Sequence, residues 1–142
     1  MARAVLDTNV IISALISEKG APRRIFDAWL AGRFTLVTSP SIIAEADRAL
    51  HYHKIRHVYG LSEEEIATAI ALLWSQGQLA SDAYHIERAS ADPEDDKFLA
   101  CALEGAAEFV VTGDKDLLSL RAYAGIPIVS PAEFLQQLRA ER

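Results

Sequence analysis

The sequence has little cysteine, no long apolar run and too few basic residues to balance its acids. The single Cys101 among 142 residues excludes a disulfide framework and any zinc site built from several cysteines. No apolar run approaches the roughly 18 residues that a membrane-spanning helix needs. The apolar stretch at 4–16 is interrupted by Asp7, whereas the core of a signal peptide should contain no carboxylate. We therefore expect a soluble cytoplasmic protein.

The charge balance favours acids, with 20 Asp and Glu against 14 Lys and Arg, and the formal charge is −6. This balance argues against a protein that simply coats nucleic acid through its phosphates. It is compatible with an enzyme whose acids gather around cations. The length of 142 residues suits one domain, residues 1–142, and is enough to build a hydrophobic core unaided.

Apolar runs and helical patterns alternate along the chain. Apolar or β-branched runs predict strands at 5–12, 34–38, 108–112 and 126–129, with a weaker one between 79 and 91. Helical spacing and capping signals predict helices at 22–32, at 39–50 or as far as 54, at 62–77, at 92–103 and from 130 onward. This order predicts an α/β fold with a mostly parallel sheet of about four to five strands flanked by helices.

Several acids adjoin the ends of the predicted strands. They are Asp7 in the first run, Glu45 after the second strand, Asp95 and Asp96 before the third, and Asp114 and Asp116 just beyond Thr112. Ligand sites in open α/β sheets gather at the carboxyl ends of the strands, so these acids are candidates for one site. Crowded carboxylates repel one another and have raised pKa values unless cations neutralise them. A set of oxygen ligands favours Mg²⁺ or Mn²⁺ and suits metal-assisted hydrolysis of a phosphodiester.

Each acid also has a purely structural interpretation. Asp7 can be a buried aspartate that caps a neighbouring loop. Glu45 can be an acid on a helix face that pairs with Arg48 or Arg56. The acids of the Thr-Gly-Asp-Lys-Asp segment at 112–116 can be ordinary turn residues. Composition alone does not choose between these interpretations and the metal site.

The acids at the start of the helix at 92–103 have different expected roles. Asp92 is most simply an N-cap, with no catalytic role. Measured from Lys97 at about 100° per residue, Asp95 points to the packed side together with Leu99, and Asp96 points to the flank. Asp95 can also be a first-turn acid that complements the helix dipole. Its direction favours Asp95 as the ligand.

Four segments, in order over nearly the whole chain, carry a resemblance to a known family. LDTNVIISAL at 6–15 resembles the opening motif of PIN-domain nucleases. DPEDDKFLACA at 92–102 is similar to the third acidic motif of that family, and VTGDKDLL at 111–118 to the fourth. SPAEFL at 130–135 is similar to the terminal helix of VapC-like toxins, the toxin components of toxin–antitoxin pairs. The resemblance implies a three-layer PIN-like fold.

The resemblance also implies an activity and its residues. It implies an endoribonuclease that depends on Mg²⁺ or Mn²⁺ and leaves 5′-phosphate and 3′-hydroxyl ends. By motif position the four acids are Asp7, Glu45, Asp95 and Asp114, with Asp116 as a supporting metal ligand and Asn9 and Thr112 as residues that orient the acids. The neighbouring Asp96 leaves the third position open by one residue. The resemblance further implies a small antitoxin that buries the acidic pocket, and a homodimer.

A basic cluster follows the second predicted helix and could carry RNA. It contains Arg48, His51, His53, Lys54, Arg56 and His57, with Tyr52 and Tyr59 available to stack on bases. Among these, Arg48, Lys54 and Arg56 are the candidate RNA contacts. The cluster can equally be a solvated helix end whose cations complement the helix dipole. Trp29, Trp74 and the helix around 66–73 likewise suit either a dimer interface or the core.

Two other classes of function compete with the nuclease. One is a PIN-like module that binds RNA or protein without cutting it. The other is an α/β phosphatase or receiver domain, which also uses an aspartate at a strand end. Asn9 stands where such phosphatases usually have a second aspartate, and the paired acids of a receiver's first strand are missing. The phosphatase and receiver hypotheses are therefore weaker.

Overall fold

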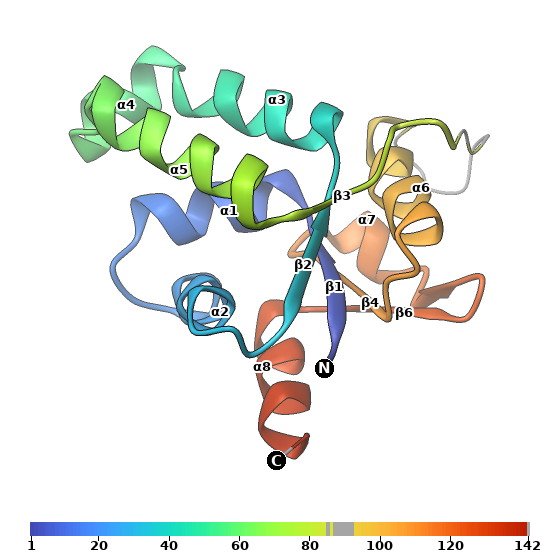
Figure 1. Ribbon diagram of the computed structural model, residues 1–142. Coiled ribbons are helices and arrows are strands. Elements are labelled where there is room, and N and C mark those ends of the chain that lie inside the picture. The colour runs from blue at the N-terminus through green and yellow to red at the C-terminus, as the bar shows by residue number, and fades with distance from the viewer. Residues whose placement is uncertain (85, 87–92, 142) are drawn as a thin grey trace.

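A six-stranded sheet forms the middle of the fold in the computed structural model, which describes residues 1–84, 86 and 93–141 (Figure 1). The strands are β1 (Arg3–Leu6), β2 (Thr35–Thr38), β3 (Gln78–Leu79), β4 (Phe109–Val111), β5 (Ala122–Tyr123) and β6 (Ile126–Val129). Their order in the sheet is β3-β2-β1-β4-β6-β5. All neighbours pair in parallel except β5 and β6, which are antiparallel.

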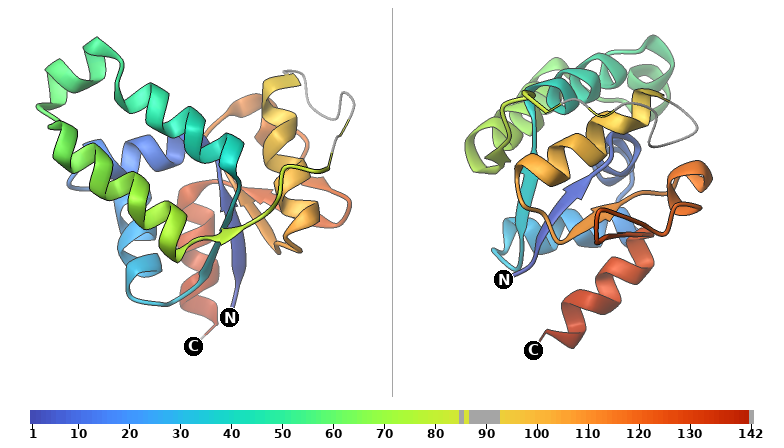
Figure 2. Two further views of the ribbon diagram at one scale, coloured as in Figure 1. Left: turned by 45° about the horizontal axis from the view of Figure 1, so that its top comes forward. Right: turned by 90° about the vertical axis from the view of Figure 1, so that its right-hand side faces the viewer.

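Helices cover both faces of this sheet. They are α1 (Thr8–Ile16), α2 (Ala21–Leu30), α3 (Pro40–Leu50), α4 (His53–Tyr59), α5 (Glu63–Gln76), α6 (Asp96–Glu104), α7 (Lys115–Leu118) and α8 (Pro131–Ala140), with a 3-10 turn η1 (Pro93–Asp95) before α6. Figure 1 shows α6 on one side of β1 and β2, and α1, α2 and α5 on the other. In the right-hand view of Figure 2, α6 crosses one face of the strands. The predicted α/β fold with a mostly parallel sheet is confirmed.

The first predicted strand is wrong beyond Leu6. Helix α1 begins at Thr8, and the apolar residues of the run at 10–12 are buried on a helix. A short apolar run does not distinguish a buried strand from a buried helix, which explains the error. The side chain of Asp7 accepts a hydrogen bond from the backbone N–H of Val10 and so caps α1. The boundary between strand and helix therefore falls at this acid.

Local capping signals located the later helices well. Ser62 with Glu65, and Ser130 with Glu133, form reciprocal capping boxes at the starts of α5 and α8, as predicted. The extension of the second helix as far as 54 is wrong, because α3 ends at Leu50 and a separate helix α4 follows. Two short elements, α7 and β5, were missed. The sheet has six strands rather than four to five because the two-residue strands β3 and β5 join its two edges. The weak strand predicted between 79 and 91 falls partly outside the described residues.

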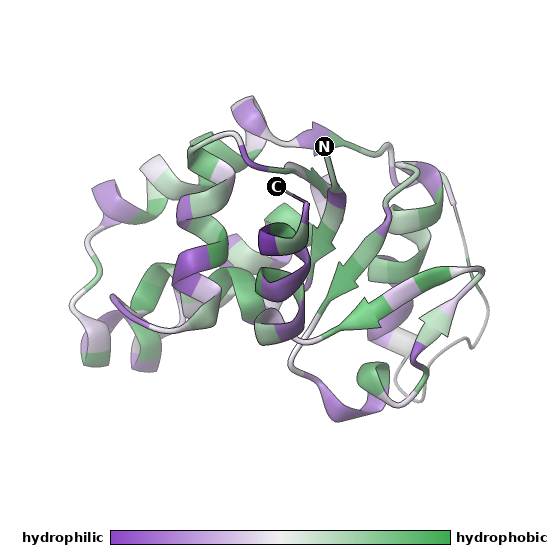
Figure 3. Cartoon of the chain, turned by 90° about the horizontal axis from the view of Figure 1, so that it is seen from below, coloured by the Kyte–Doolittle hydropathy of each residue, from purple (hydrophilic) through white to green (hydrophobic). Residues whose placement is uncertain are grey.

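The interior is a continuous apolar core on both sides of β1 and β4. Phe134 of α8 contacts Phe34 and Phe109 edge to face, with ring centroids 5.1 and 5.5 Å apart. Trp29 is 6% exposed and belongs to this core, whereas Trp74 is 45% exposed. Figure 3 shows hydrophobic residues concentrated along the strands. No helix in the described part of the chain is long and apolar enough to cross a bilayer.

Gly105, at the end of α6, allows this helix to pack closely on the sheet. A Cβ atom at this position would lie 2.3 Å from Cγ1 of Val37, which is fully buried in β2. We expect Gly105→Ala to lower the free energy of unfolding by about 1–3 kcal/mol through overpacking, measured by urea denaturation. Gly113→Ala is the matched control, since a Cβ there meets nothing within 4 Å. An equal loss in both variants would contradict this account.

Candidate active site

Asp7 is the most constrained acid of the candidate site. Asp7 lies between the end of β1 and the start of α1, and the residue is only 3% exposed. Oδ1 accepts a hydrogen bond from the N–H of Val10 at 2.8 Å, and Oδ2 accepts one from the hydroxyl of Thr112. The backbone N–H of Asp7 donates to the carbonyl of Val111 at 3.0 Å. Both the backbone and the carboxylate are thereby fixed.

Thr112 connects Asp7 to a second acid at the end of the neighbouring strand. Its hydroxyl donates to Asp7 and accepts a hydrogen bond from the backbone N–H of Asp114 at 3.0 Å. Asp114 in turn caps α7, since its Oδ1 accepts from the N–H of Asp116 at 2.9 Å. Asp116 itself is exposed, and so is Asn9 in the first turn of α1. The ends of β1 and β4 therefore hold two carboxylates in a fixed relation.

The charges of two other carboxylates act on Asp7. Burial raises the pKa of Asp7 above its usual range, and the negative charges of Asp114 and Glu45 raise it further. The hydrogen bonds from Thr112 and Val10 lower the pKa and partly oppose this effect. Three acids from β1, α3 and the end of β4 thus interact, although they are far apart in the sequence.

Glu45 is held by a cation rather than left facing the other acids. Lys97 of α6 forms an ion pair with the carboxylate of Glu45 and lies 3.8 Å from Glu94. The side chains of Lys97 and Glu45 are only 22% and 30% exposed. The structural interpretation that paired Glu45 with Arg48 or Arg56 did not anticipate this partner. The ammonium group therefore offsets part of the negative charge of the site.

The two candidates for the third acid differ in burial. Asp96 is 6% exposed and begins α6, whereas Asp95 is half-buried in the 3-10 turn before the helix. Burial therefore favours Asp96 over Asp95, and the helical wheel measured from Lys97 does not extend back to Asp95, because Asp95 lies in a 3-10 turn of different geometry. Asp92, predicted as an N-cap, lies outside the described residues.

The oxygen atoms of these acids are the type of ligand that a hard divalent cation prefers, but the acids are not grouped as a complete set of metal ligands among the described residues. Asp7, Glu45 and Asp114 offer only oxygen ligands, and their mutual repulsion is what a divalent cation would relieve. Among residues 1–84, 86 and 93–141, no three His, Cys, Asp or Glu side chains come close enough together to hold a metal ion. Glu45 is engaged by Lys97 and can contribute its carboxylate only after leaving that partner.

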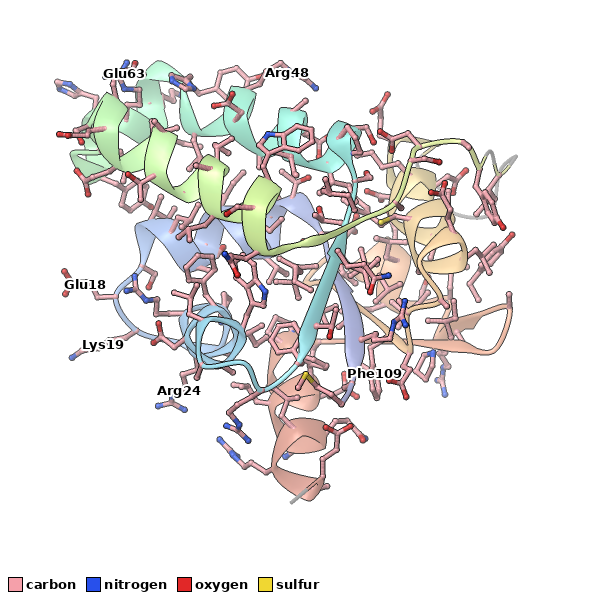
Figure 4. All side chains as sticks on the ribbon, in the orientation of Figure 1. Glu18, Lys19, Arg24, Arg48, Glu63 and Phe109 are labelled. Atoms are coloured by element: carbon pink, nitrogen blue, oxygen red, sulfur yellow. The ribbon has the colours of Figure 1, made fainter. Side chains whose placement is uncertain are left out.

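The basic cluster begins at the C-terminal end of α3, about one turn beyond Glu45, and continues into α4. Arg48 follows Glu45 by three residues, about 4.5 Å along the helix axis at about 1.5 Å per residue. His51 and Arg56 both contact Glu63, at 2.9 and 2.7 Å, while Arg48 and Lys54 are exposed. Figure 4 shows Arg48 and Glu63 on the outer surface of the helices. Part of the cluster is therefore neutralised by α5.

Two features of the site are not predicted from the sequence: the place of Lys97 in it, and the contacts of Asp82 with the start of α3. Lys97 belongs to the DDK segment of the third motif, but its partner on α3 is a tertiary contact. Asp82 contacts the start of α3 through the N–H and hydroxyl of Ser41, at 2.9 and 2.8 Å. No sequence pattern around Lys97 or Asp82 indicates its contact with α3.

His51 provides a test of the electrostatics of the basic cluster. Hydrogen bonds to the backbone of Asp47 and to the carboxylate of Glu63 raise the pKa of His51 above about 6.5. Its pairing therefore stabilises the fold below that pH, and this contribution is lost as the pH rises through the raised pKa. We expect an NMR titration midpoint above about 6.5 that falls in Glu63→Gln. A midpoint unchanged by Glu63→Gln would contradict the assignment.

Comparisons with known proteins agree with this architecture. A family model described as PIN domain matches residues 3–116. The uncharacterized protein MJ1680 of Methanocaldococcus jannaschii is 33% identical over 143 residues, which cover 95% of this chain and 90% of that protein. The crystal structure of VapBC2 from Rickettsia felis, bound to a DNA fragment from their promoter, covers 90% of this chain and 98% of the matched chain, with a TM-score of 0.56 and 13% identity. The last match is a likeness of fold. With the family model spanning most of its length, the chain belongs to the PIN-domain family.

Proposed function

We propose that this protein is an endoribonuclease that depends on Mg²⁺ or Mn²⁺ and forms a single domain over residues 1–142. The observation that carries the proposal is the buried Asp7, which Thr112 links to Asp114 at the carboxyl ends of β1 and β4, with Glu45 of α3 near enough for its charge to act on Asp7. Membership of the PIN-domain family, whose members are generally nucleases that use divalent metals, supports it. The acids have the oxygen chemistry that such metals prefer.

Each residue of the site has a proposed role. Asp7 and Asp114 hold the metal with the third acid, Asp116 supports them, and Thr112 keeps the first two in register. Glu45, once it has left Lys97, orients the attacking water. A bound divalent ion supplies a lowered pKa for that water and stabilises the charge on the leaving oxygen. Asn9 is proposed to help orient the acids from the first turn of α1.

The third acid is proposed to be Asp96 rather than Asp95. Asp96 is the more buried of the two, at 6% exposed, and begins the helix that also carries Lys97. Lys97 pairs with Glu45, so the start of α6 lies beside the other acids. Asp95 was the choice favoured by the sequence and remains the alternative that the variants below distinguish.

The biological setting is proposed by likeness. The terminal segment resembles that of VapC-like toxins, the other motifs resemble those of PIN-domain nucleases, and the structural neighbour carries the name VapBC2. We propose that this chain is a cytoplasmic toxin, that a small antitoxin covers its acidic site, and that it forms a homodimer. Arg48, Lys54 and Arg56 remain proposed RNA contacts, although Arg56 already contacts Glu63.

A second candidate function is a PIN-like module that binds RNA or protein without cutting it. One observation favours this function: among the described residues the acids do not converge into a metal-binding group, and Lys97 holds Glu45. The two functions differ in a simple assay. A nuclease cleaves a mixed RNA pool with Mn²⁺ and stops when a chelator is added, whereas a binding module shows no cleavage in either condition.

Asp7→Asn separates the role of Asp7 in activity from its role in folding. We expect cleavage of the RNA pool with Mn²⁺ to fall at least about 100-fold, since a metal ligand should matter at least as much as the residues that support it. Burial raises the pKa of Asp7, so its ionised form destabilises the fold above that pKa. The urea-unfolding free energy of Asp7→Asn at pH 7 should therefore equal or exceed that of the wild type. Wild-type cleavage by this variant would reject the assignment.

Asp95→Asn and Asp96→Asn form a matched pair for the third acid. We expect Asp96→Asn to reduce the rate of RNA cleavage at least about 100-fold and Asp95→Asn to reduce it less than about tenfold. Mn²⁺ affinity, measured by isothermal titration calorimetry, should fall in the same order. The reverse order would restore Asp95 as the third acid, and circular dichroism should show that both variants remain folded.

A further inference from the structure

A cavity of about 360 Å³ lies directly beside the candidate active site. The described residues around it come from the first turn of α3, from α6 and from the stretch between β3 and η1, where Asp82, Tyr84 and Ile86 contribute. Asp96 and Lys97 are part of its wall, and Lys97 is also the partner of Glu45. The cavity and the acid site therefore share the start of α6. Its volume falls within the range of about 300–1,000 Å³ that is usual for small-molecule sites.

Two carboxylates hold residues 81–84 in place, a segment that contributes Asp82 and Tyr84 to the cavity wall. Asp82 accepts hydrogen bonds from the N–H and the hydroxyl of Ser41, at 2.9 and 2.8 Å. Glu104 of α6 accepts hydrogen bonds from the backbone N–H groups of Ser81 and Ala83, the latter at 3.1 Å. Both negative charges are thus engaged by donors of the protein itself. The segment is held against α3 on one side and α6 on the other.

The wall of the cavity contains both an aromatic ring and a cation. Tyr84 contributes to the cavity wall and is 52% exposed, so part of its surface is available to a ligand. Among the described residues of the wall, Lys97 is the only basic side chain. An aromatic ring with a nearby cation is the combination that binds one nucleotide of a single strand, through base stacking and a phosphate contact.

We propose that this cavity is a subsite for one nucleotide of single-stranded RNA, next to the phosphate that is cut. The base stacks on Tyr84, and the phosphate of that nucleotide contacts Lys97. The inference rests on the proposed function, because the cavity gains its meaning from the adjoining acids. A phosphate at Lys97 would replace Glu45 as its partner and release that carboxylate toward the acid site. Binding of the RNA strand and the arrival of Glu45 at the acid site are then coupled through the ammonium group of Lys97.

Photo-crosslinking tests the position of the base. A short single-stranded RNA containing 5-iodouridine is irradiated with the full chain in EDTA, and the crosslinked residue is identified by mass spectrometry. Tyr52, Tyr59 and Tyr84 are 66%, 52% and 52% exposed, so accessibility alone does not favour Tyr84. We expect the crosslink at Tyr84. A crosslink confined to Tyr52 or Tyr59 would overturn the subsite and favour the basic cluster as the RNA path.

Fluorescence anisotropy with the same RNA tests the two contacts separately. Tyr84→Ala should weaken binding about tenfold or more through lost stacking, while Tyr84→Phe keeps the ring and stays within about twofold. Lys97→Gln should weaken binding and reduce the slope of log affinity against log salt by about 1, while Lys97→Arg keeps both. Wild-type affinity and salt slope in Tyr84→Ala and Lys97→Gln would overturn the proposal. Circular dichroism should show that all four variants are folded.

Cleavage by the wild-type protein with Mn²⁺ separates this inference from the proposed function. Cleavage that is unaffected by Tyr84→Ala and Lys97→Gln rejects the subsite and leaves the nuclease standing. RNA held at Tyr84 without any cleavage rejects the nuclease and retains a nucleotide site. The absence of both binding and cleavage rejects the two proposals together.

Discussion

The buried carboxylate of Asp7 joins three parts of the fold. It accepts hydrogen bonds from Val10 at the start of α1 and from Thr112 beyond β4, while its own N–H pairs with β4. These contacts stop β1 and begin α1 at the point where the carboxyl ends of two parallel strands meet. Burial opposes the charge, so the protein keeps an acid here at a cost to its stability. Such a cost is typical of functional sites rather than of structural ones.

Lys97 reduces the repulsion among the acids near the start of α6. Its ammonium pairs with Glu45 and lies near Glu94, so part of the negative charge is offset from within the chain. The ammonium of Lys97 is carried on a flexible four-carbon side chain, so it can change partners without a movement of the backbone. The ion pair therefore stabilises the folded chain and can still be exchanged for a ligand contact. This exchange links the acid site to the neighbouring cavity.

Sequence patterns located those features that depend on local chemistry. The capping boxes at Ser62 and Ser130 begin their helices as predicted, and the parallel α/β order followed from the apolar runs. The end of β1 was missed because apolar content is the same in a buried strand and a buried helix. Strand β5 has only two residues, too few to show a period. The partner of Glu45 and the burial of Asp96 depend on how α6 meets α3, which sequence spacing does not report.

The acids of this chain separate into two groups by their environment. Glu104 and Glu133 accept hydrogen bonds from exposed backbone N–H groups, and these bonds lower the pKa of both carboxyls. Asp7 also accepts such a bond, but burial and neighbouring charges raise its pKa instead. Glu104 holds the segment after β3, and Glu133 caps the start of α8. An added positive charge near Asp7 would relieve the repulsion that raises its pKa, whereas Glu104 and Glu133 already have their charge stabilised by backbone donors.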